Sequence, residues 1–311
     1  MSNGVKKIED DSKKKKTFNG FYLGKFYYLK VGPDKTVLPS NFEEFYDRIT
    51  NFEVRDDDVF TLAFPKTGSR WMQEMVWLLV NNLNFKKAME VPLEQRSRVL
   101  ELQMFFNKEE YGFDKLEESE SPRCIKSHLP WSLLPKSIRN GVKKPKIIVT
   151  LRGPEDTCTS YYHFARVLAN YQESWEDFCE MFLDDKVPFS PFWKHLLGLW
   201  EQRHRPNIIF IKFNQMKSDL TGTIRDLAAF LGKNLSNEDI SKLCKHLSFD
   251  NLKTSKGYNM EHLKDVQETG INPFVRKGNV GDHRNCMSPK VIEAFKKQRK
   301  QFLYGTGITF D

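Results

Sequence analysis

The sequence predicts an α/β fold in which one domain is built around a central, mostly parallel sheet flanked by helices. Short apolar runs bounded by polar residues are typical of buried strands, and three such runs are Val59–Phe64, Lys146–Leu151 and Asn207–Phe213. Apolar residues recur at helical spacing over Trp71–Leu83, Ser160–Leu168 and Thr221–Leu231. Strands that alternate with helices in this way indicate βαβ units, in which helices cover both faces of the sheet.

The two ends of the chain carry simpler signals. Residues 1–17 are polar and charged, and we expect them to form a disordered basic tail ahead of a single domain over residues 18–311. The segment Phe18–Tyr28 is rich in aromatic residues and alternates in a way that suits an early strand or hairpin. Gly232 follows the last predicted helix, where it suits the left-handed position after a helix C-terminus.

Composition and charge exclude several classes of protein. The 311 residues include 49 Lys and Arg against 41 Asp and Glu, and the net charge of +8 favours an anionic partner. No apolar run approaches the ~18 residues of a membrane span, so we expect no transmembrane helix and no membrane partner. The basic run Lys13–Lys16 is more typical of a solvated tail than of a nucleic-acid site, and no nucleic-acid partner is expected.

The five cysteines are scattered and odd in number, and none forms a C-x-x-C pair. This usage argues against both a disulfide framework and a zinc site, so we expect no bound metal. A reducing compartment fits it best, and the expected location is the cytoplasm.

Ligands of such folds bind beyond the carboxyl ends of the strands, and the first predicted strand is followed there by a glycine-containing turn. Backbone N–H groups and the helix dipole make such a turn an anion site, to which Lys66 and the hydroxyls of Thr67 and Ser69 would add donors. An ordinary strand-to-helix turn is the alternative. The turn is not a Walker A loop, because Lys66 precedes Gly68, and this weakens an NTPase or kinase interpretation.

Two further segments suit phosphate groups. Arg152 leaves the second predicted strand and Ser160 follows eight residues later, so that a guanidinium and a hydroxyl could meet on one phosphate. Near the C-terminus, Arg276, Lys277 and Gly278 begin a basic, glycine-spaced loop. Each segment alone is more typical of a solvated face, but together they indicate a ligand with several phosphate groups.

One histidine stands in a setting that suits acid–base chemistry. His128 is expected in a loop between the first two strands, two residues after Lys126 and two before Pro130. Such a histidine can act as a general base near neutral pH, although a single histidine more often has a structural role.

Taken in order, FPKTGSRW, KSHLP, RGPEDTCTSYY and RKGNVGDH resemble the motifs of the cytosolic sulfotransferases. That family moves a sulfuryl group from 3'-phosphoadenosine 5'-phosphosulfate (PAPS) to an acceptor. The resemblance covers roughly residues 50 to 290. Glu74–Leu79 and Leu83–Phe85 look more like the arthropod branch that includes retinol dehydratase.

The resemblance implies PAPS as sulfuryl donor, no metal and three catalytic side chains. Lys66 would stabilise the charge on the bridging oxygen, and Lys126 would stabilise the sulfuryl group during its transfer. His128 would take the proton from the acceptor hydroxyl. The turn would be a P-loop-like phosphosulfate-binding turn, Arg152 and the basic loop would hold the 3'-phosphate, and aromatic rings would flank the adenine. The implied nucleotide-binding residues are Lys66, Thr67, Gly68, Ser69, Arg70, Trp71, Arg152, Ser160, Phe213, Phe249, Arg276, Lys277 and Gly278.

Four positions depart from the family pattern and bear on nucleotide affinity. Arg70 stands where the family usually has Thr, so its guanidinium either replaces a phosphate hydroxyl or points away. Phe213 stands where the family often has a Tyr, and Leu247 stands where it usually has a Thr. His283 replaces the Trp of the family's G-D-W motif. The family's dimer signature is not matched over Arg284–Lys297, so both a monomer and a homodimer stay open.

The sequence leaves three functions open. The leading one is sulfonation of a small lipophilic alcohol or phenol, as in xenobiotic or hormone metabolism, with Phe26, Tyr161 and Phe164 as candidate acceptor contacts. The second is a dehydratase that forms a sulfonated alcohol and then eliminates sulfate. The third is a nucleotide- or hydrophobe-binding protein that has lost turnover through Arg70 and His283.

Overall fold

The computed structural model describes residues 6–7, 28–105, 112–168, 171–259 and 279–310. Its larger sheet is parallel throughout, in the order β5-β6-β4-β7-β8, and a smaller antiparallel sheet has the order β1-β2-β3. The predicted α/β class is therefore confirmed. The strands are β1 (Lys6–Lys7), β2 (Tyr28–Val31), β3 (Thr36–Pro39), β4 (Val59–Ala63), β5 (Arg98–Val99), β6 (Cys124–Ser127), β7 (Lys146–Leu151) and β8 (Ile208–Lys212).

Helices connect and cover the strands of the larger sheet. The α-helices are α1 (Phe42–Thr50), α2 (Ser69–Val80), α3 (Phe85–Glu90), α4 (Leu93–Arg96), α5 (Phe113–Glu117), α6 (Lys136–Arg139), α7 (Pro154–Leu168), α8 (Trp175–Leu183), α9 (Phe192–Trp200), α10 (Phe213–Ser218), α11 (Leu220–Phe230), α12 (Asn237–His246), α13 (Phe249–Thr254) and α14 (Pro289–Leu303). Short 3-10 helices are η1 (Leu102–Met104), η3 (Trp131–Leu133) and η5 (Asp282–Asn285). Of the helices in the described ranges, none combines the length and the apolarity needed to cross a bilayer.

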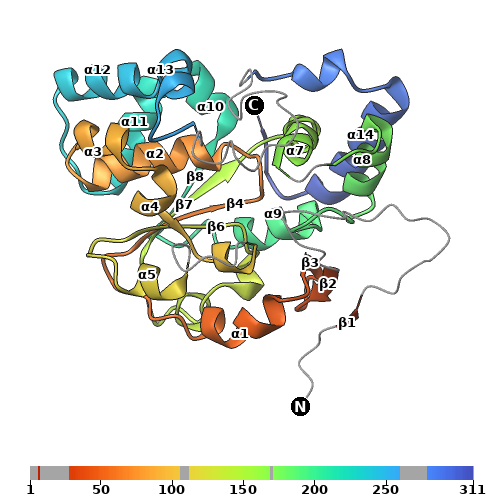
Figure 1. Cartoon of the computed structure of the whole chain (residues 1–311). Helices are drawn as coiled ribbons and strands as arrows, with labels where there is room; N and C mark the ends of the chain where they lie inside the picture. The colour runs from red at the N-terminus through yellow and green to blue at the C-terminus, as the bar shows by residue number, and fades with distance from the viewer. Residues whose placement is uncertain (1–5, 8–27, 106–111, 169–170, 260–278, 311) are drawn as a thin grey trace.

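The parallel sheet is buried on both faces. Ile148 and Ile211 pack in a buried cluster with residues of α2, α11 and α12, whereas Ile147 and Val149 pack in a second cluster with residues of α7, α8 and α9. Figure 1 shows α2, α11 and α12 gathered on one side of the molecule and α7, α8 and α14 on the other. Full burial of such a side chain contributes roughly 1.5–3 kcal/mol. Burial on both faces explains why these strands appear in the sequence as continuous apolar runs.

The predicted strands and helices are present in the structure, but some of the helices begin at other residues than predicted. Each of the three predicted strands is present within one residue of its expected bounds. The helix predicted to start at Ser160 begins earlier, at Pro154, and the one predicted from Trp71 begins at Ser69. Gly232 has φ +67°, the left-handed conformation expected after α11.

His128 lies in a loop, as expected, but the strand directly before it was not predicted. Lys126 belongs to β6, which pairs in parallel with β4, and His128 follows the strand directly. This four-residue strand includes a lysine, so it lacks the apolar run by which the other strands were predicted. The two-residue β5 was missed for the same reason.

Most of the N-terminal segment for which we expected a basic tail and an aromatic strand lies outside the described residues. Within the expected basic tail, Lys6–Lys7 pair with Leu29 and Lys30 of β2, so the structure differs from the expectation at these two residues. The rest of residues 1–17 and residues 18–27 lie outside the described part of the chain. Tyr28 begins a hairpin of β2 and β3, which starts where the predicted aromatic segment ends.

All five parallel strands end on one edge of the sheet, and this edge carries the candidate site. In the order of the strands across the sheet, β5, β6, β4, β7 and β8, the site residues within three positions of each strand's end are Glu101, His128, Lys66, Arg152 and Phe213.

Candidate active site

The turn between β4 and α2 needs glycine for two reasons. Gly68 has φ +97°, a conformation that favours glycine, and a Cβ built there would lie 2.7 Å from Phe213 Cδ2 and 3.0 Å from Met216 Cε. The N-cap residue of α2 is Gly68 itself, which has no side chain to cap the first backbone N–H groups of the helix. The predicted anion turn therefore has a glycine-dependent shape and begins a helix at an N-cap without a side chain.

The Thr67 hydroxyl is used within the turn. It donates to the Phe64 carbonyl at 2.9 Å, so the Thr150 hydroxyl on β7, also at 2.9 Å, must donate to it. Thr67 thus attaches the turn to the sheet. Ser69, the first residue of α2, is also buried.

Two lysines at the sheet edge have lowered pKa values. Burial, together with the positive charges of Lys126, Arg152 and Arg70, lowers the pKa of Lys66 to about 7. Burial and the charge of Arg70 lower the pKa of Lys126 to about 8. The Lys66 ammonium also lies 4.4 Å from the centre of the Phe164 ring. A bound anion would offset this repulsion and raise both pKa values, so the cluster suits a phosphate or sulfate group.

The contacts of His128 determine which ring nitrogen can accept a proton. Its Nδ1 lies 2.7 Å from the Ala63 carbonyl oxygen, which can only accept, so Nδ1 carries the hydrogen and Nε2 carries the lone pair. Burial, reinforced by the charge of Lys126, holds the pKa of His128 well below its usual 6.5. The imidazole is therefore neutral near pH 7, and its Nε2 can serve as a base.

The backbone of His128 is held by two residues that the sequence interpretation missed. Its N–H donates to the Glu101 carboxylate at 2.6 Å, and its carbonyl accepts from His195 Nε2 at 2.9 Å. A sequence signal for Glu101 exists, since it is a single acidic residue between the apolar Val99–Leu100 and Leu102. His195 gives no comparable signal, because it lies within a largely apolar helix and no motif surrounds it.

Arg152 connects three parts of the site. Its Nη1 donates to the Lys66 carbonyl at 3.2 Å and its Nη2 to the Asn279 carbonyl at 3.1 Å, while its guanidinium lies 4.2 Å from the centre of the Phe213 ring. Ser160 lies half-buried on α7, the helix that begins two residues after Arg152. The predicted partners Arg276, Lys277 and Gly278 lie outside the described residues, and Asn279 follows them directly.

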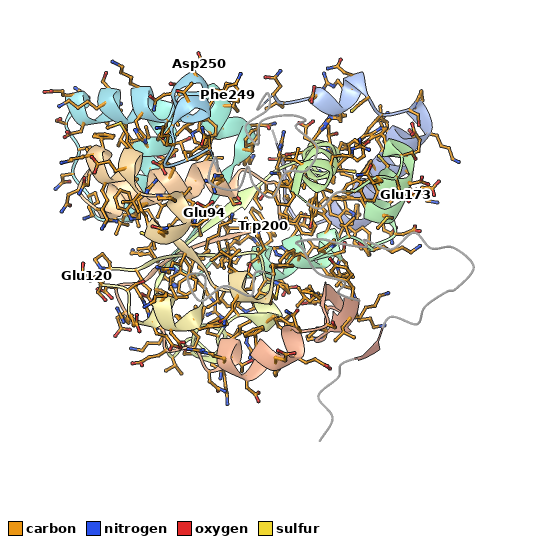
Figure 2. All side chains as sticks on the ribbon, in the orientation of Figure 1. Glu94, Glu120, Glu173, Trp200, Phe249 and Asp250 are labelled. Atoms are coloured by element: carbon orange, nitrogen blue, oxygen red, sulfur yellow. The ribbon has the colours of Figure 1, made fainter. Side chains whose placement is uncertain are left out.

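Arg70, which departs from the family pattern, has clear partners in the structure. The Arg70 guanidinium forms an ion pair with Glu94 and donates from Nε to the Tyr258 carbonyl at 2.8 Å. It also lies 4.9 Å from the centre of the Tyr258 ring. Figure 2 shows Glu94 towards the centre of the molecule, consistent with its burial. Of the two orientations left open by the sequence, these contacts favour a guanidinium that points away from the turn.

Aromatic residues gather beside the start of α2. The Trp71 and Phe213 rings meet edge to face with centres 6.2 Å apart, and Trp71 Nε1 donates to the Leu247 carbonyl at 3.0 Å. Phe249 begins α13 two residues after Leu247, and Figure 2 shows it on that helix. The predicted adenine-flanking residues thus come from elements that contact one another.

His283 binds a carboxylate on α7. Its Nδ1 lies 2.6 Å from Asp156 Oδ1, and the Gly281 N–H donates to Asp156 Oδ2 at 2.7 Å. Burial raises the pKa of Asp156, but the hydrogen bonds from His283 and Gly281 outweigh it and hold the pKa below its usual value. His283, which stands where the family has Trp, therefore anchors the turn after Asn279.

The three candidate acceptor contacts fall in different places. Phe164 contacts Lys66, as described above, and so lies at the site. Tyr161 is fully buried, and its hydroxyl donates to the Pro188 carbonyl at 3.1 Å, which places it in the core. Phe26 lies outside the described residues. In the part of the chain that the structure describes, no group of three or more His, Cys, Asp or Glu side chains could hold a metal ion.

Comparison with known proteins identifies relatives that match most of the chain. Residues 56–307 match the family described as sulfotransferase domain. Luciferin sulfotransferase of Photinus pyralis is 36% identical, over 98% of this chain and 88% of that protein. Sulfotransferase 1E1 of Cavia porcellus is 33% identical, over 88% of this chain and 92% of that protein. The fold is similar to the crystal structure of retinol dehydratase in a complex with retinol and PAP, with a TM-score of 0.84 and 30% identity over 92% of each chain.

Proposed function

Because this chain belongs to the sulfotransferase family, we propose that it transfers a sulfuryl group from PAPS to the hydroxyl of a small lipophilic alcohol or phenol. The observation that carries this proposal is the state of His128, a neutral imidazole whose Nδ1 hydrogen is bound to Ala63 and whose Nε2 can accept a proton. We assign His128 as the base that deprotonates the acceptor hydroxyl.

The cationic edge of the sheet supports PAPS as donor. When bound, PAPS supplies the sulfuryl group and leaves as 3'-phosphoadenosine 5'-phosphate (PAP). Lys66 and Lys126 carry mutually repelling charges that an anion would relieve, and the N-terminus of α2, whose N-cap is Gly68, would add backbone donors. The similar retinol dehydratase structure contains PAP, which adds weight to this assignment.

The remaining roles are those that the family resemblance implies for this chain. Lys66 would stabilise the charge that develops on the phosphate oxygen as its bond to sulfur breaks, and the acceptor proton would pass to His128 Nε2. The 3'-phosphate would be held by Arg152, Ser160, Arg276, Lys277 and Gly278, and the turn residues Thr67, Gly68, Ser69 and Arg70 would surround the 5'-phosphosulfate. Trp71, Phe213 and Phe249 would contact the adenine. Of the turn residues, Arg70 has the weakest support, because its guanidinium is paired with Glu94.

Release of PAP tests the proposal whichever acceptor the protein uses, because every transfer yields PAP. Purified protein is incubated with PAPS and a pool of phenols, sterols, retinoids and luciferin, and acceptor-dependent PAP is measured. His128→Ala should abolish this release while PAP affinity, measured by calorimetry, stays within about twofold, because the imidazole acts on the acceptor proton. Unchanged turnover in His128→Ala would remove it as the base, and a wild-type protein that binds no PAPS would contradict the donor assignment.

A dehydratase is the second candidate function. The structural similarity to retinol dehydratase, at a TM-score of 0.84, favours it specifically. In that reaction the sulfonated alcohol formed first would lose sulfate and a proton to give an alkene. Both reactions release PAP, so mass analysis of the organic product separates them. Free sulfate and a product lighter by one water support the dehydratase, and a sulfate ester supports the transferase.

We also propose one catalytic domain over residues 18–311, located in the cytoplasm. The family match over residues 56–307 supports the domain. The cysteines support the location, because all five are free thiols, and the buried sulfurs of Cys158 and Cys179 lie 3.9 Å apart. Thiols this close are more compatible with a reducing compartment than with an oxidising one.

A further inference from the structure

Glu101 is a buried carboxylate at the catalytic edge of the sheet. It lies just beyond β5, and the Leu100 N–H extends the ladder to β6 by donating to the Lys126 carbonyl at 2.8 Å. Only 1% of its surface is exposed. A buried charge is unfavourable unless hydrogen bonds compensate it, so its contacts point to its role.

Both carboxylate oxygens of Glu101 accept hydrogen bonds from consecutive residues. Oε1 accepts from the His128 N–H at 2.6 Å, and Oε2 accepts from the Ser127 hydroxyl at 2.8 Å. The Ser127 oxygen in turn accepts from the Leu129 N–H at 3.1 Å. The ionised carboxylate suits this arrangement because both of its oxygens can accept, whereas a neutral acid places a hydrogen on one of them.

These contacts hold the backbone of His128, the proposed base, in place. Glu101 holds the N–H of His128, His195 holds its carbonyl, and Ala63 holds ring Nδ1. We infer that Glu101 is a positioning residue, whose carboxylate holds the His128 peptide so that the ring keeps its Nδ1 hydrogen on Ala63 and presents Nε2 as the base. This inference rests on the proposed function of His128.

The charge of Glu101 adds a pH dependence. Burial raises the pKa of Glu101 to about 7, against the lowering effect of the His128 N–H, the Ser127 hydroxyl and the nearby Lys126 charge. His128 itself keeps a pKa well below 6.5. As pH falls through about 7, Glu101 therefore becomes protonated while His128 is still neutral. The acidic limb of the pH profile of kcat should then report the protonation of Glu101 and not that of His128.

Glu101→Gln tests the positioning role, because it keeps the shape of the side chain and removes the charge. We expect kcat to fall about 10- to 100-fold, since a hydrogen bond to a charged group is stronger than one between neutral groups. KM for PAPS should stay unchanged and the acidic limb near pH 7 should disappear. Glu74→Gln is the matched control, because Glu74 is an equally buried carboxylate that contacts Arg96 and His246 and is no part of the proposed machinery. It should keep the acidic limb.

Ser127→Ala keeps the test decisive if Glu101→Gln does not fold. Loss of the Ser127 hydroxyl removes a hydrogen bond that lowers the pKa of Glu101, so the acidic limb should move to higher pH while the plateau of kcat is little changed. An acidic limb that stays in place in Ser127→Ala, or a folded Glu101→Gln with wild-type kcat and pH profile, would overturn the inference.

A spectroscopic measurement separates this inference from the proposed function. The ¹⁵N shifts of the His128 ring report its tautomer whether or not an acceptor is known. We expect one tautomer, with hydrogen on Nδ1, in the wild type and a mixture in Glu101→Gln. A wild type without transfer activity contradicts the proposed function alone, whereas identical ring shifts in the two proteins contradict the role of Glu101.

Discussion

Replacement of Gly68 by alanine should damage both the stability of the fold and the nucleotide site. The φ of +97° disfavours any L-residue, and the new Cβ would meet Phe213 at 2.7 Å and Met216 at 3.0 Å. Gly232→Ala is the matched control, because Gly232 has φ +67° and a Cβ there would meet nothing within 4 Å. The difference between the two variants therefore isolates the steric contribution at Gly68.

The expected magnitudes follow from these contacts. Left-handed backbone costs an L-residue about 1–2 kcal/mol, and the lower entropy of the unfolded alanine chain offsets about 0.4–1 kcal/mol of this. Gly232→Ala should therefore lower the free energy of unfolding by about 1 kcal/mol. Crowding in a packed interior costs a further ~1–3 kcal/mol, so Gly68→Ala should lose about 2–4 kcal/mol in total.

Urea unfolding and PAP calorimetry measure the two effects. Phe213 also lies against Arg152 and Trp71, so a displaced Phe213 ring should weaken PAP binding by about tenfold or more in Gly68→Ala and leave it unchanged in Gly232→Ala. Equal losses of stability in the two variants, with PAP affinity intact in both, would show that close contact with α10 does not shape the turn.

Two further predictions concern the ion pairs around the site. Arg70→Ala should lower the free energy of unfolding by about 3–5 kcal/mol because it removes the ion pair between Arg70 and the buried Glu94. The double variant with Glu94→Ala should recover part of that loss, and an additive double variant in urea unfolding would contradict the pairing. Asp156 has a lowered pKa, so its contribution to stability is present above the unfolded value of about 3.9 and is lost as pH falls through its folded pKa. Asp156→Asn should flatten the fall in thermal stability below about pH 4, and a slope equal to that of the wild type would argue against a charged anchor for His283 and Gly281.

Sequence reasoning reached the elements whose signals are local. The strand Lys146–Leu151 agrees in both bounds because burial on two faces makes it a continuous apolar run. The turn before α2 was identified because a lysine, hydroxyl residues and a glycine follow a strand directly. His128 was selected from its own motif, although the strand β6 before it was not.

Long-range contacts decided what those residues can do. The partners of Arg70 are 24 and 188 residues away along the chain, so no local pattern shows that its guanidinium is paired with Glu94 and the Tyr258 carbonyl. The Nδ1 hydrogen of His128 is located by Ala63, 65 residues earlier. Glu101 reaches His128 only because β5 and β6 are neighbours in the sheet.

Apolar periodicity and motif spacing are properties of short stretches of chain, so the fold class, the family resemblance and the candidate groups could be predicted from them. The charge, the tautomer and the supporting contacts of those groups depend instead on how the chain packs. Burial and neighbouring charges set the pKa values of Lys66 and His128, and both arise only when strands distant in the chain are packed side by side.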